Sequence, residues 1–397
     1  MSKPVTSNSQ FLPPKLNPLL TRLIQSVSCT VVYWVYQLEL DVKAEDVAKV
    51  KAIASERVVY LSNHSHLDDG IAIFLLSARL GQLFHYIVAY EAFKGLIGKL
   101  LQSVGAYSIR RGMGDRKSVV QTLKILQQPA CKLVIFPEGG CSYQNDTVMP
   151  FRTGAIELSF KALAQLAKKN STIPNFYLVP VSLKYRYSHE MDSAIAKTLK
   201  SLETALQIRS STKDFYPRLR AISERVLTNL ETEYHLETSP TEDWNLRIQK
   251  LKTYLLNWCE QKLSIEPNPQ IPIRERVYKI QSYLESADEA VPKLKPEINS
   301  AIRIATFRLL NFDAIYDGYV AANPTPERFL DTLDRLEREI FHIDRPPPKG
   351  HRQARIRMGT PINLKEYWQS YQQNRENTVE NLTQQLQQIV QDNLTNK

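Results

Sequence analysis

Residues 57–79 read RVVYLSNHSHLDDGIAIFLLSAR. The β-rich run Arg57–Leu61 leads into a polar loop, and the apolar stretch Ile71–Arg79 continues with the composition of a helix. In α/β proteins, ligands bind outside the carboxyl ends of the strands. The stretch therefore predicts an α/β fold with candidate site residues in the loop between strand and helix.

Within this loop, His64 and Asp69 form a His-x4-Asp pattern. A histidine can accept a proton near neutral pH, and a carboxylate on its other ring nitrogen fixes the tautomer and balances the imidazolium charge. An ordinary polar strand-to-helix loop produces the same pattern, so the pair needs support from other segments. His66 has Ile71 rather than an acid five residues on, and we interpret His66 and Asp68 as structural.

Further β-rich runs alternate with helical patterns up to residue 187. The expected strands are Tyr107–Arg110, Lys132–Phe136 and Phe176–Tyr185, and the expected helices are Asp115–Gln127 and Ala155–Lys168. This alternation predicts a mixed sheet flanked by helices over a core of residues 46–187. Pro180 lacks a backbone N–H, so we expect its strand to lie at a sheet edge or to contain a bulge.

Residues 188–350 have almost no strand pattern and consist of charged helical stretches, from which we expect five or six helices. Strand character returns at Arg352–Met358, and a Gln-rich helix over Glu366–Asn393 ends the sequence. We therefore predict a large all-helical insertion, 188–350, before the last strand, and a return to the core over 351–397. Leu382, Leu386 and Val390 share one helical face, which indicates that the tail helix packs on the core.

The composition limits which kinds of molecule we expect the protein to bind. A hydrophobic content of 43% suits a folded chain, and the net charge of +10 favours nucleic acid, anionic lipid or an acidic carrier protein. Without a nucleic-acid motif we expect no nucleic acid, and without a Gly-x-Ser-x-Gly elbow we expect no serine hydrolase. Four cysteines without CxxC spacing argue against a metal site or a disulfide framework and fit a reducing compartment.

Two segments are candidates for membrane contact. We interpret residues 1–45 as an interfacial, membrane-associated helical segment without a signal peptide; residues 17–38 are largely uncharged, and whether they span a bilayer stays open. The apolar face of Phe93–Val104, with Lys94 and Lys99 nearby, fits either anionic lipid or ordinary packing on the sheet. We expect a peripheral or monotopic membrane protein on the cytoplasmic face.

Three more segments support the His-x4-Asp pair. Gly105–Gly112 contains adjacent Arg110 and Arg111, and guanidinium groups match phosphate oxygens. Val134–Ser142 is an apolar strand that leads into Pro137-Glu138-Gly139-Gly140, where glycines permit close approach of a ligand. Leu178–Leu183 is the strand that contains Pro180.

Together these segments resemble the glycerophospholipid acyltransferase family, typified by lysophosphatidic acid acyltransferase. The family's four blocks fall, in the family's order, at Asn63–Asp69, Gly105–Arg111, Phe136–Ser142 and Val179–Val181. The resemblance covers residues 50–187 and resumes at Arg355–Ile362.

The resemblance implies an O-acyltransferase of phospholipid biosynthesis. It implies transfer of a fatty acyl group from acyl-CoA or acyl-carrier protein to a glycerolipid hydroxyl, with 1-acylglycerol-3-phosphate as the acceptor and phosphatidic acid as the product. His64 would be the general base and Asp69 its orienting partner. The donor is a co-substrate, so no cofactor and no metal are expected.

The resemblance also implies which residues bind substrate: Arg111, with Arg110 or Arg152, for the acceptor phosphate, and Glu138 and Gly139 for the acceptor pocket. One departure bears on this: Gly140-Cys141 stand where the family has Thr-Arg, and that arginine is associated with the phosphate. Another lysophospholipid or polar lipid as the acceptor, or a non-catalytic lipid-binding relative, therefore remains an alternative. The identity of the donor, the acyl-chain preference and the role of the insertion stay open.

Overall fold

The computed structural model describes residues 11–112, 114–170, 172–237, 239, 241–285 and 294–395, and the first ten residues of the expected membrane-associated segment lie outside this description. The described chain forms two compact units. The sheet unit contains residues 11–110, 115–188 and 351–395, and the helical unit contains residues 111–114 and 189–350, with the gaps just given.

The sheet unit is built on one sheet with the strand order β1-β7-β6-β2-β5-β3-β4, in which β8 also pairs with β6. The strands are β1 Leu38–Val42, β2 Arg57–Ser62, β3 His85–Ala89, β4 Ala106–Ile109, β5 Lys132–Ile135, β6 Phe176–Tyr187, β7 Arg352–Met358 and β8 Ile362–Asn363. Strand β2 is parallel to β5 and β6, whereas β6 is antiparallel to β7 and β8. The predicted mixed sheet flanked by helices is confirmed.

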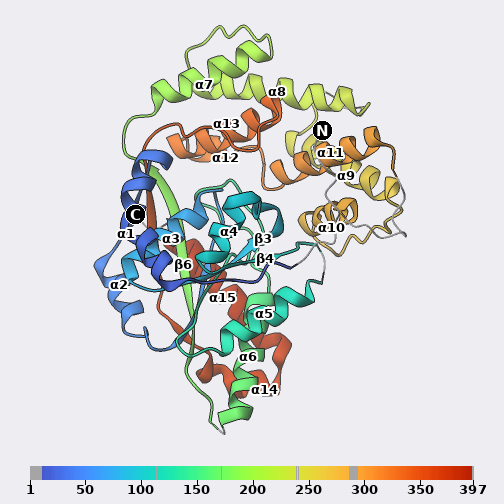
Figure 1. The fold of residues 1–397 in the computed structure, drawn as a ribbon. Helices are drawn as coiled ribbons and strands as arrows, with labels where there is room; N and C mark the ends of the chain where they lie inside the picture. Colours follow the sequence, from blue (N-terminus) through green and yellow to red (C-terminus); the bar gives the residue numbers. More distant parts are fainter. Residues whose placement is uncertain are drawn as a thin grey trace. The chain divides into compact units, whose positions relative to one another are not determined.

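Helices cover both faces of the sheet (Figure 1). Their bounds are α1 Pro18–Tyr36, α2 Ala44–Lys51, α3 Asp69–Leu80, α4 Gly95–Ser103, α5 Arg116–Gln127, α6 Gly154–Asn170, α14 Trp368–Gln373 and α15 Arg375–Thr395. Alternation along β2 explains the two layers: Val58 and Tyr60 pack in a core with α1, α2 and α3, whereas Val59 and Leu61 pack in a core with α5, α6 and α15. Short 3₁₀ turns complete the unit at Tyr90–Ala92 and Leu364–Tyr367.

The structure differs from the sequence expectations at three places. Strands β1 and β3 were not foreseen, and β1 lies within the segment that was expected to be helical. The tail helix is divided at Asn374 into α14 and α15. Strand β6 is central rather than at an edge, and Pro180 is tolerated because the antiparallel partner of β6 changes there from β8, which pairs up to Leu178, to β7, which pairs from Val181.

The described part of the helical unit has seven helices, one more than the upper expectation, and the shortest has four residues. They are α7 Asp192–Ala205, α8 Phe215–Glu233, α9 Trp244–Lys262, α10 Ile273–Glu285, α11 Pro296–Asn311, α12 Tyr319–Ala322 and α13 Pro326–Phe341. Buried ion pairs connect several of them, including Arg247 with Glu231 at 2.7 Å and Arg308 with Glu339 at 2.7 Å.

Candidate active site

The candidate site lies at the carboxyl ends of two adjacent parallel strands. Strand β2 ends at Ser62 and β5 ends at Ile135, and the two strands pair in parallel register. His64 therefore follows one strand by two residues, and Glu138 follows the other by three. Polar loops at this position are the usual place for a site in a parallel sheet.

His64 and Asp69 are hydrogen-bonded to each other. Nδ1 of His64 lies 2.8 Å from Oδ2 of Asp69, which is the bond expected from the His-x4-Asp spacing. Asp69 is fully buried as the first residue of α3, whereas the His64 side chain is 23% exposed. Because Nδ1 is occupied by the carboxylate, Nε2 is the ring nitrogen left for a substrate.

The backbone of His64 is held from the loop that follows β5. The His64 N–H donates to Oε1 of Glu138 at 2.7 Å, and the His64 carbonyl accepts from the N–H of Ser142 at 2.7 Å. The second oxygen of Glu138 accepts from the N–H of Met149 at 3.2 Å, and the imidazole stacks on Phe136 at 4.5 Å between ring centres. Glu138, which is almost fully buried, thus braces two loops at once.

Arg152 is brought to the same loop. Its guanidinium lies over Gly139, so closely that a Cβ at this position would be 2.4 Å from Cζ of Arg152. Gly139 also has a positive φ of 74°, so both space and backbone conformation call for glycine. The predicted residues His64, Asp69, Glu138, Gly139 and Arg152 are therefore gathered in one region of the sheet unit.

The two adjacent arginines of the second block belong to different units. Arg110 belongs to the sheet unit, where its N–H donates to Asp115 at 3.0 Å and its guanidinium lies 5.3 Å from the ring centre of Tyr90. Arg111 belongs to the helical unit, where its guanidinium lies 4.2 Å from the ring centre of Tyr278 and donates to the hydroxyl at 2.9 Å. Each of these contacts thus lies within a single unit.

Sequence reasoning missed residues that hold the site from β6 and β7. The hydroxyl of Tyr185 donates to Oδ1 of Asp69 at 2.7 Å. Arg352 donates to Asp68 at 2.6 Å, and one of its guanidinium nitrogens lies 3.3 Å from Nε2 of His66. The contacts of Asp68 and His66 agree with their interpretation as structural residues. Only the pairing of distant strands brings Tyr185 and Arg352 here, so no local spacing indicates them.

The amide of Asn63 docks the site loop on β6. Its Nδ2 donates to the carbonyl of Leu183 at 2.9 Å, and its Oδ1 accepts from the N–H of Leu183 at 2.7 Å. The side chain thus extends the pairing of β2 with β6 past Ser62, the last residue of β2. An asparagine can do this because its amide carries the same donor and acceptor as a peptide group.

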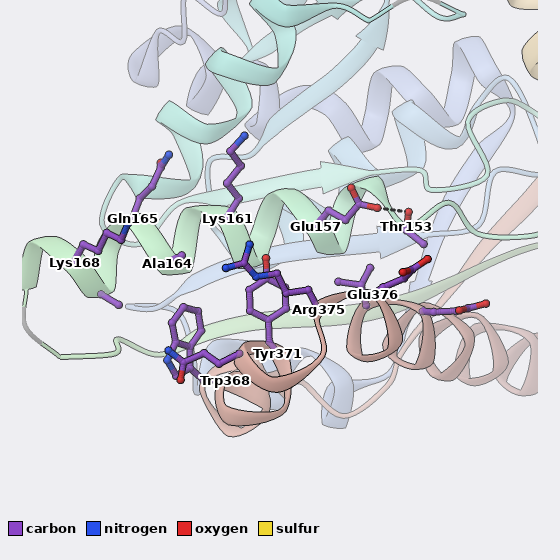
Figure 2. A pocket seen from close by; sticks show the side chains of 14 residues that line it. Thr153, Glu157, Lys161, Ala164, Gln165, Lys168, Trp368, Tyr371, Arg375 and Glu376 are labelled. Carbon is purple, nitrogen blue, oxygen red and sulfur yellow. Dashed lines mark hydrogen bonds between the residues drawn. The ribbon is translucent and has the colours of Figure 1, made fainter.

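A large groove of the sheet unit lies apart from these residues. It has a volume of about 1220 Å³ between α6 and the C-terminal helices α14 and α15 (Figure 2). Lys161, Lys168 and Arg375 line it, but Glu157, Glu376 and Glu380 balance their charge. None of the predicted site residues lines the groove, and we assign it no role in the chemistry. Within the described residues, no group of three or more His, Cys, Asp and Glu side chains could hold a metal ion.

Residues 41–184 match the family model described as Acyltransferase. The matched segment begins in β1 and ends in β6, and it contains His64, Asp69, Glu138 and Arg152. The match supports the acyltransferase family, and acyl transfer in general, for the part of the chain that forms most of the sheet.

Proposed function

From this match and the hydrogen-bonded His64–Asp69 pair at the strand ends, we propose that the protein transfers a fatty acyl group from a thioester donor to a lipid hydroxyl. The observation that supports the proposal most is the 2.8 Å bond from a buried carboxylate to Nδ1 of a partly exposed histidine. This arrangement suits a general base whose Nε2 faces substrate.

In the proposed reaction, Nε2 of His64 removes the proton from the acceptor hydroxyl as its oxygen attacks the thioester carbonyl. The C–S bond of the resulting tetrahedral intermediate then breaks, and the imidazolium returns the proton to the leaving thiolate. Asp69 balances the charge of the imidazolium during both steps. The nucleophile comes from the substrate itself, so no acyl-enzyme forms.

For the acceptor we propose 1-acylglycerol-3-phosphate, which would give phosphatidic acid, and for the donor acyl-CoA or acyl-carrier protein. Arg152 is our candidate for the acceptor phosphate because its guanidinium lies over Gly139, next to the residue that braces His64. A guanidinium matches phosphate geometry. It would replace the arginine that the family has at the position of Cys141.

The test is acyl transfer from labelled acyl-CoA and labelled acyl-carrier protein to lysophosphatidic acid, glycerol-3-phosphate and uncharged or zwitterionic lysolipids. We expect transfer that His64→Ala lowers by at least about 10²-fold, because general-base assistance contributes about 10²–10⁴-fold. The exposed His189 provides the matched control, and His189→Ala should keep the wild-type rate. Absence of His64-dependent transfer to every acceptor would contradict the proposal and favour a lipid-binding protein.

A charge-neutralisation series tests the acceptor. Arg152→Gln should raise KM for the phosphate-bearing acceptor and leave KM for an uncharged lysolipid unchanged. Arg110→Gln and Arg111→Gln are the comparison variants. If either of these, and not Arg152→Gln, raises KM, the phosphate is bound by the second block instead. Transfer only to lysolipids without a phosphate monoester would identify a different acceptor class.

We further propose that the sheet unit works at the surface of an anionic membrane as a peripheral or monotopic protein. Helix α1 supports this because its polarity is inverted. Its buried face carries Thr21, Gln25 and Ser28 beside one buried valine, and the side chains of Thr21 and Gln25 dock the helix by hydrogen bonds to Ser103 and Ser77. Most of its large apolar side chains are exposed instead. The exposed residues include Leu19, Leu23, Val27, Val31, Trp34 and Val35, and Trp34 is 74% exposed. A water-facing helix has the opposite arrangement.

Helix α4 adds to this face. Its Leu96, Ile97 and Leu100 are exposed, and the start of α1 is joined to its end, since the Asn17 N–H donates to the Ser103 carbonyl at 2.9 Å. Residues 11–110, 115–188 and 351–395 of the sheet unit have 25 Lys and Arg against 16 Asp and Glu, whereas residues 111–114 and 189–350 have 24 against 25. The basic excess thus accompanies the sheet unit. None of the described helices is both long and apolar enough to span a bilayer.

Sedimentation with vesicles tests membrane contact. Binding should be stronger to vesicles with phosphatidylglycerol than to neutral vesicles, and Leu23→Asp with Trp34→Asp should reduce it by tenfold or more, since each large apolar side chain contributes about 1.5–3 kcal/mol on burial. Val120→Asp, at an exposed apolar residue of α5, is the control. Equal binding by both variants would refute the contact by α1.

A further inference from the structure

Neighbouring side chains hold both the backbone and the aromatic ring of Tyr185. Its N–H donates to Oδ1 of Asn145 at 2.6 Å, and its carbonyl accepts from Nδ2 of Asn145 at 2.7 Å. Its buried ring meets His66 edge-on at 5.5 Å between ring centres, and the guanidinium of Arg352 lies 5.2 Å from the ring centre. A ring held in this way aims its hydroxyl in one direction.

The Tyr185 hydroxyl points to the carboxylate of Asp69. The hydroxyl donates to Oδ1 at 2.7 Å, while Oδ2 accepts from the His66 N–H at 2.9 Å and lies 2.8 Å from Nδ1 of His64. Because both oxygens accept hydrogen bonds, the carboxylate cannot rotate freely and Oδ2 stays turned toward the imidazole. Burial, and next the negative charge of Asp69, raise the pKa of Tyr185 well above its ordinary range, so the phenol remains a donor.

We propose that Tyr185 is a positioning residue for the His64–Asp69 pair, because its hydroxyl orients Asp69 and withdraws part of the negative charge that the carboxylate presents to the imidazole. This role rests on the proposed acyl transfer for its kinetic consequences, but not for its effect on His64 itself. Other ionisable groups lie around the pair on each neighbouring element: His66 and Asp68 in the same loop, Glu138 and Cys141 after β5, and Arg352 on β7.

Tyr185→Phe removes only the hydroxyl and keeps the ring between His66 and Arg352. We expect kcat to fall about 10- to 100-fold, as for loss of a hydrogen bond to a charged group, while KM stays unchanged. The acid limb of the pH–rate profile should move to higher pH, because a carboxylate with one donor fewer favours the protonated imidazole more strongly. Tyr177→Phe, at the other end of β6, should change neither quantity.

A double-mutant cycle shows whether Tyr185 acts through Asp69. In an Asp69→Asn background, Tyr185→Phe should have little further effect on kcat, because the group that it orients has lost its charge. Equal effects in both backgrounds would overturn the proposal. Thermal unfolding of each variant separates this result from a loss of folded protein.

The imidazole resonances of His64, followed by NMR from pH 4 to 9 without substrate, provide a readout that does not need acyl transfer. They should titrate at higher pH in Tyr185→Phe than in the wild type and in Tyr177→Phe. Identical titrations would refute the role of Tyr185, whether or not the protein transfers acyl groups. Absence of His64-dependent transfer together with a shifted titration would instead contradict only the proposed function.

Discussion

The sheet unit and the helical unit both bury charged side chains, but they do so differently. In the sheet unit, the buried Asp69 at the start of α3 and the buried Glu138 in the loop after β5 each contact His64. In the helical unit, buried carboxylates pair with arginines of a neighbouring helix, as in Glu231 with Arg247 and Glu260 with Arg276. Burial of a charged side chain therefore does not by itself identify a functional site. The place of that side chain in the fold and the chemistry of its partner are needed as well.

The two units differ because these buried carboxylates have different partners, arginine in the helical unit and histidine in the sheet unit. An arginine–carboxylate pair satisfies its own charges and leaves no proton to transfer at neutral pH, because the guanidinium stays protonated. A carboxylate bonded to a histidine leaves a second ring nitrogen that can gain and lose a proton. Buried carboxylates of the helical unit should therefore affect stability, whereas Asp69 and Glu138, which contact His64, should affect rate.

Arg308→Ala should give the largest effect on stability. Arg308 contacts Glu339 and Glu233, each at 2.7 Å, and it is almost fully buried. Its loss leaves Glu339 as an uncompensated buried charge, which costs about 3–5 kcal/mol. Urea unfolding measures the loss, and Arg303→Ala, at an exposed residue of the same helix, should stay within about 0.5 kcal/mol of the wild type.

The loss of folding stability in Arg308→Ala should grow as the pH rises. Burial already raises the pKa of Glu339, and Arg308 opposes that shift, so removal of Arg308 raises the pKa further. When the pKa of a carboxyl group is higher in the folded than in the unfolded state, the folded protein loses stability as the pH rises through the folded-state pKa. Arg308→Ala should therefore be closest to the wild type at low pH. A loss that is constant from pH 4 to 8 would contradict this account.

Glu138→Ala should have the next largest effect, and mainly on rate. It removes the acceptor for the N–H groups of His64 and Met149, so the loop that carries the imidazole should shift. A displacement of about 1 Å costs about 10²-fold in rate. Steady-state kinetics should show a fall in kcat with a nearly constant KM. A rise in KM alone would assign Glu138 to the acceptor pocket, and the exposed Glu157 is the control, as Glu157→Ala.

Lys132→Met should have the smallest effect and concerns a buried charge of the sheet unit away from the site. Its Nζ donates to the carbonyls of Ala54, Glu56 and Ala130, and burial lowers the pKa of Lys132 to about 8. A lysine with a lowered folded-state pKa makes stability rise with pH above that value. The wild type should thus gain about 1 kcal/mol relative to Lys132→Met between pH 8 and pH 9 in urea unfolding. Parallel stability curves would contradict the shift.

Local patterns predicted the parts of the fold that depend on neighbouring residues. The β-rich run Arg57–Leu61 and the apolar run after Lys132 indicated strands β2 and β5, and the switch to charged helical stretches after residue 187 indicated the helical segment. The spacing of His64 and Asp69 indicated their hydrogen bond, because a loop and the first turn of a helix bring the two side chains together.

Features that depend on distant pairing were not predicted. Strand β1 is only five residues long and is stabilised by β7, more than 300 residues away, so its own sequence carries little signal. The contacts of Tyr185 with Asp69 and of Arg352 with Asp68 arise from the order of strands in the sheet. The contacts of Arg110 with Tyr90 and of Arg111 with Tyr278 also follow from tertiary packing, which adjacency in sequence does not reveal.

The most direct test of the account is the rate of acyl transfer by Asp69→Asn, measured with its thermal unfolding. An asparagine can bond the wrong imidazole tautomer and cannot balance an imidazolium, so the rate should fall by about 10²–10⁴-fold. The melting temperature should remain near that of the wild type, because the side chain keeps its shape. A wild-type rate in a folded Asp69→Asn variant would show that the buried carboxylate beside His64 has only a structural role, like those of the helical unit.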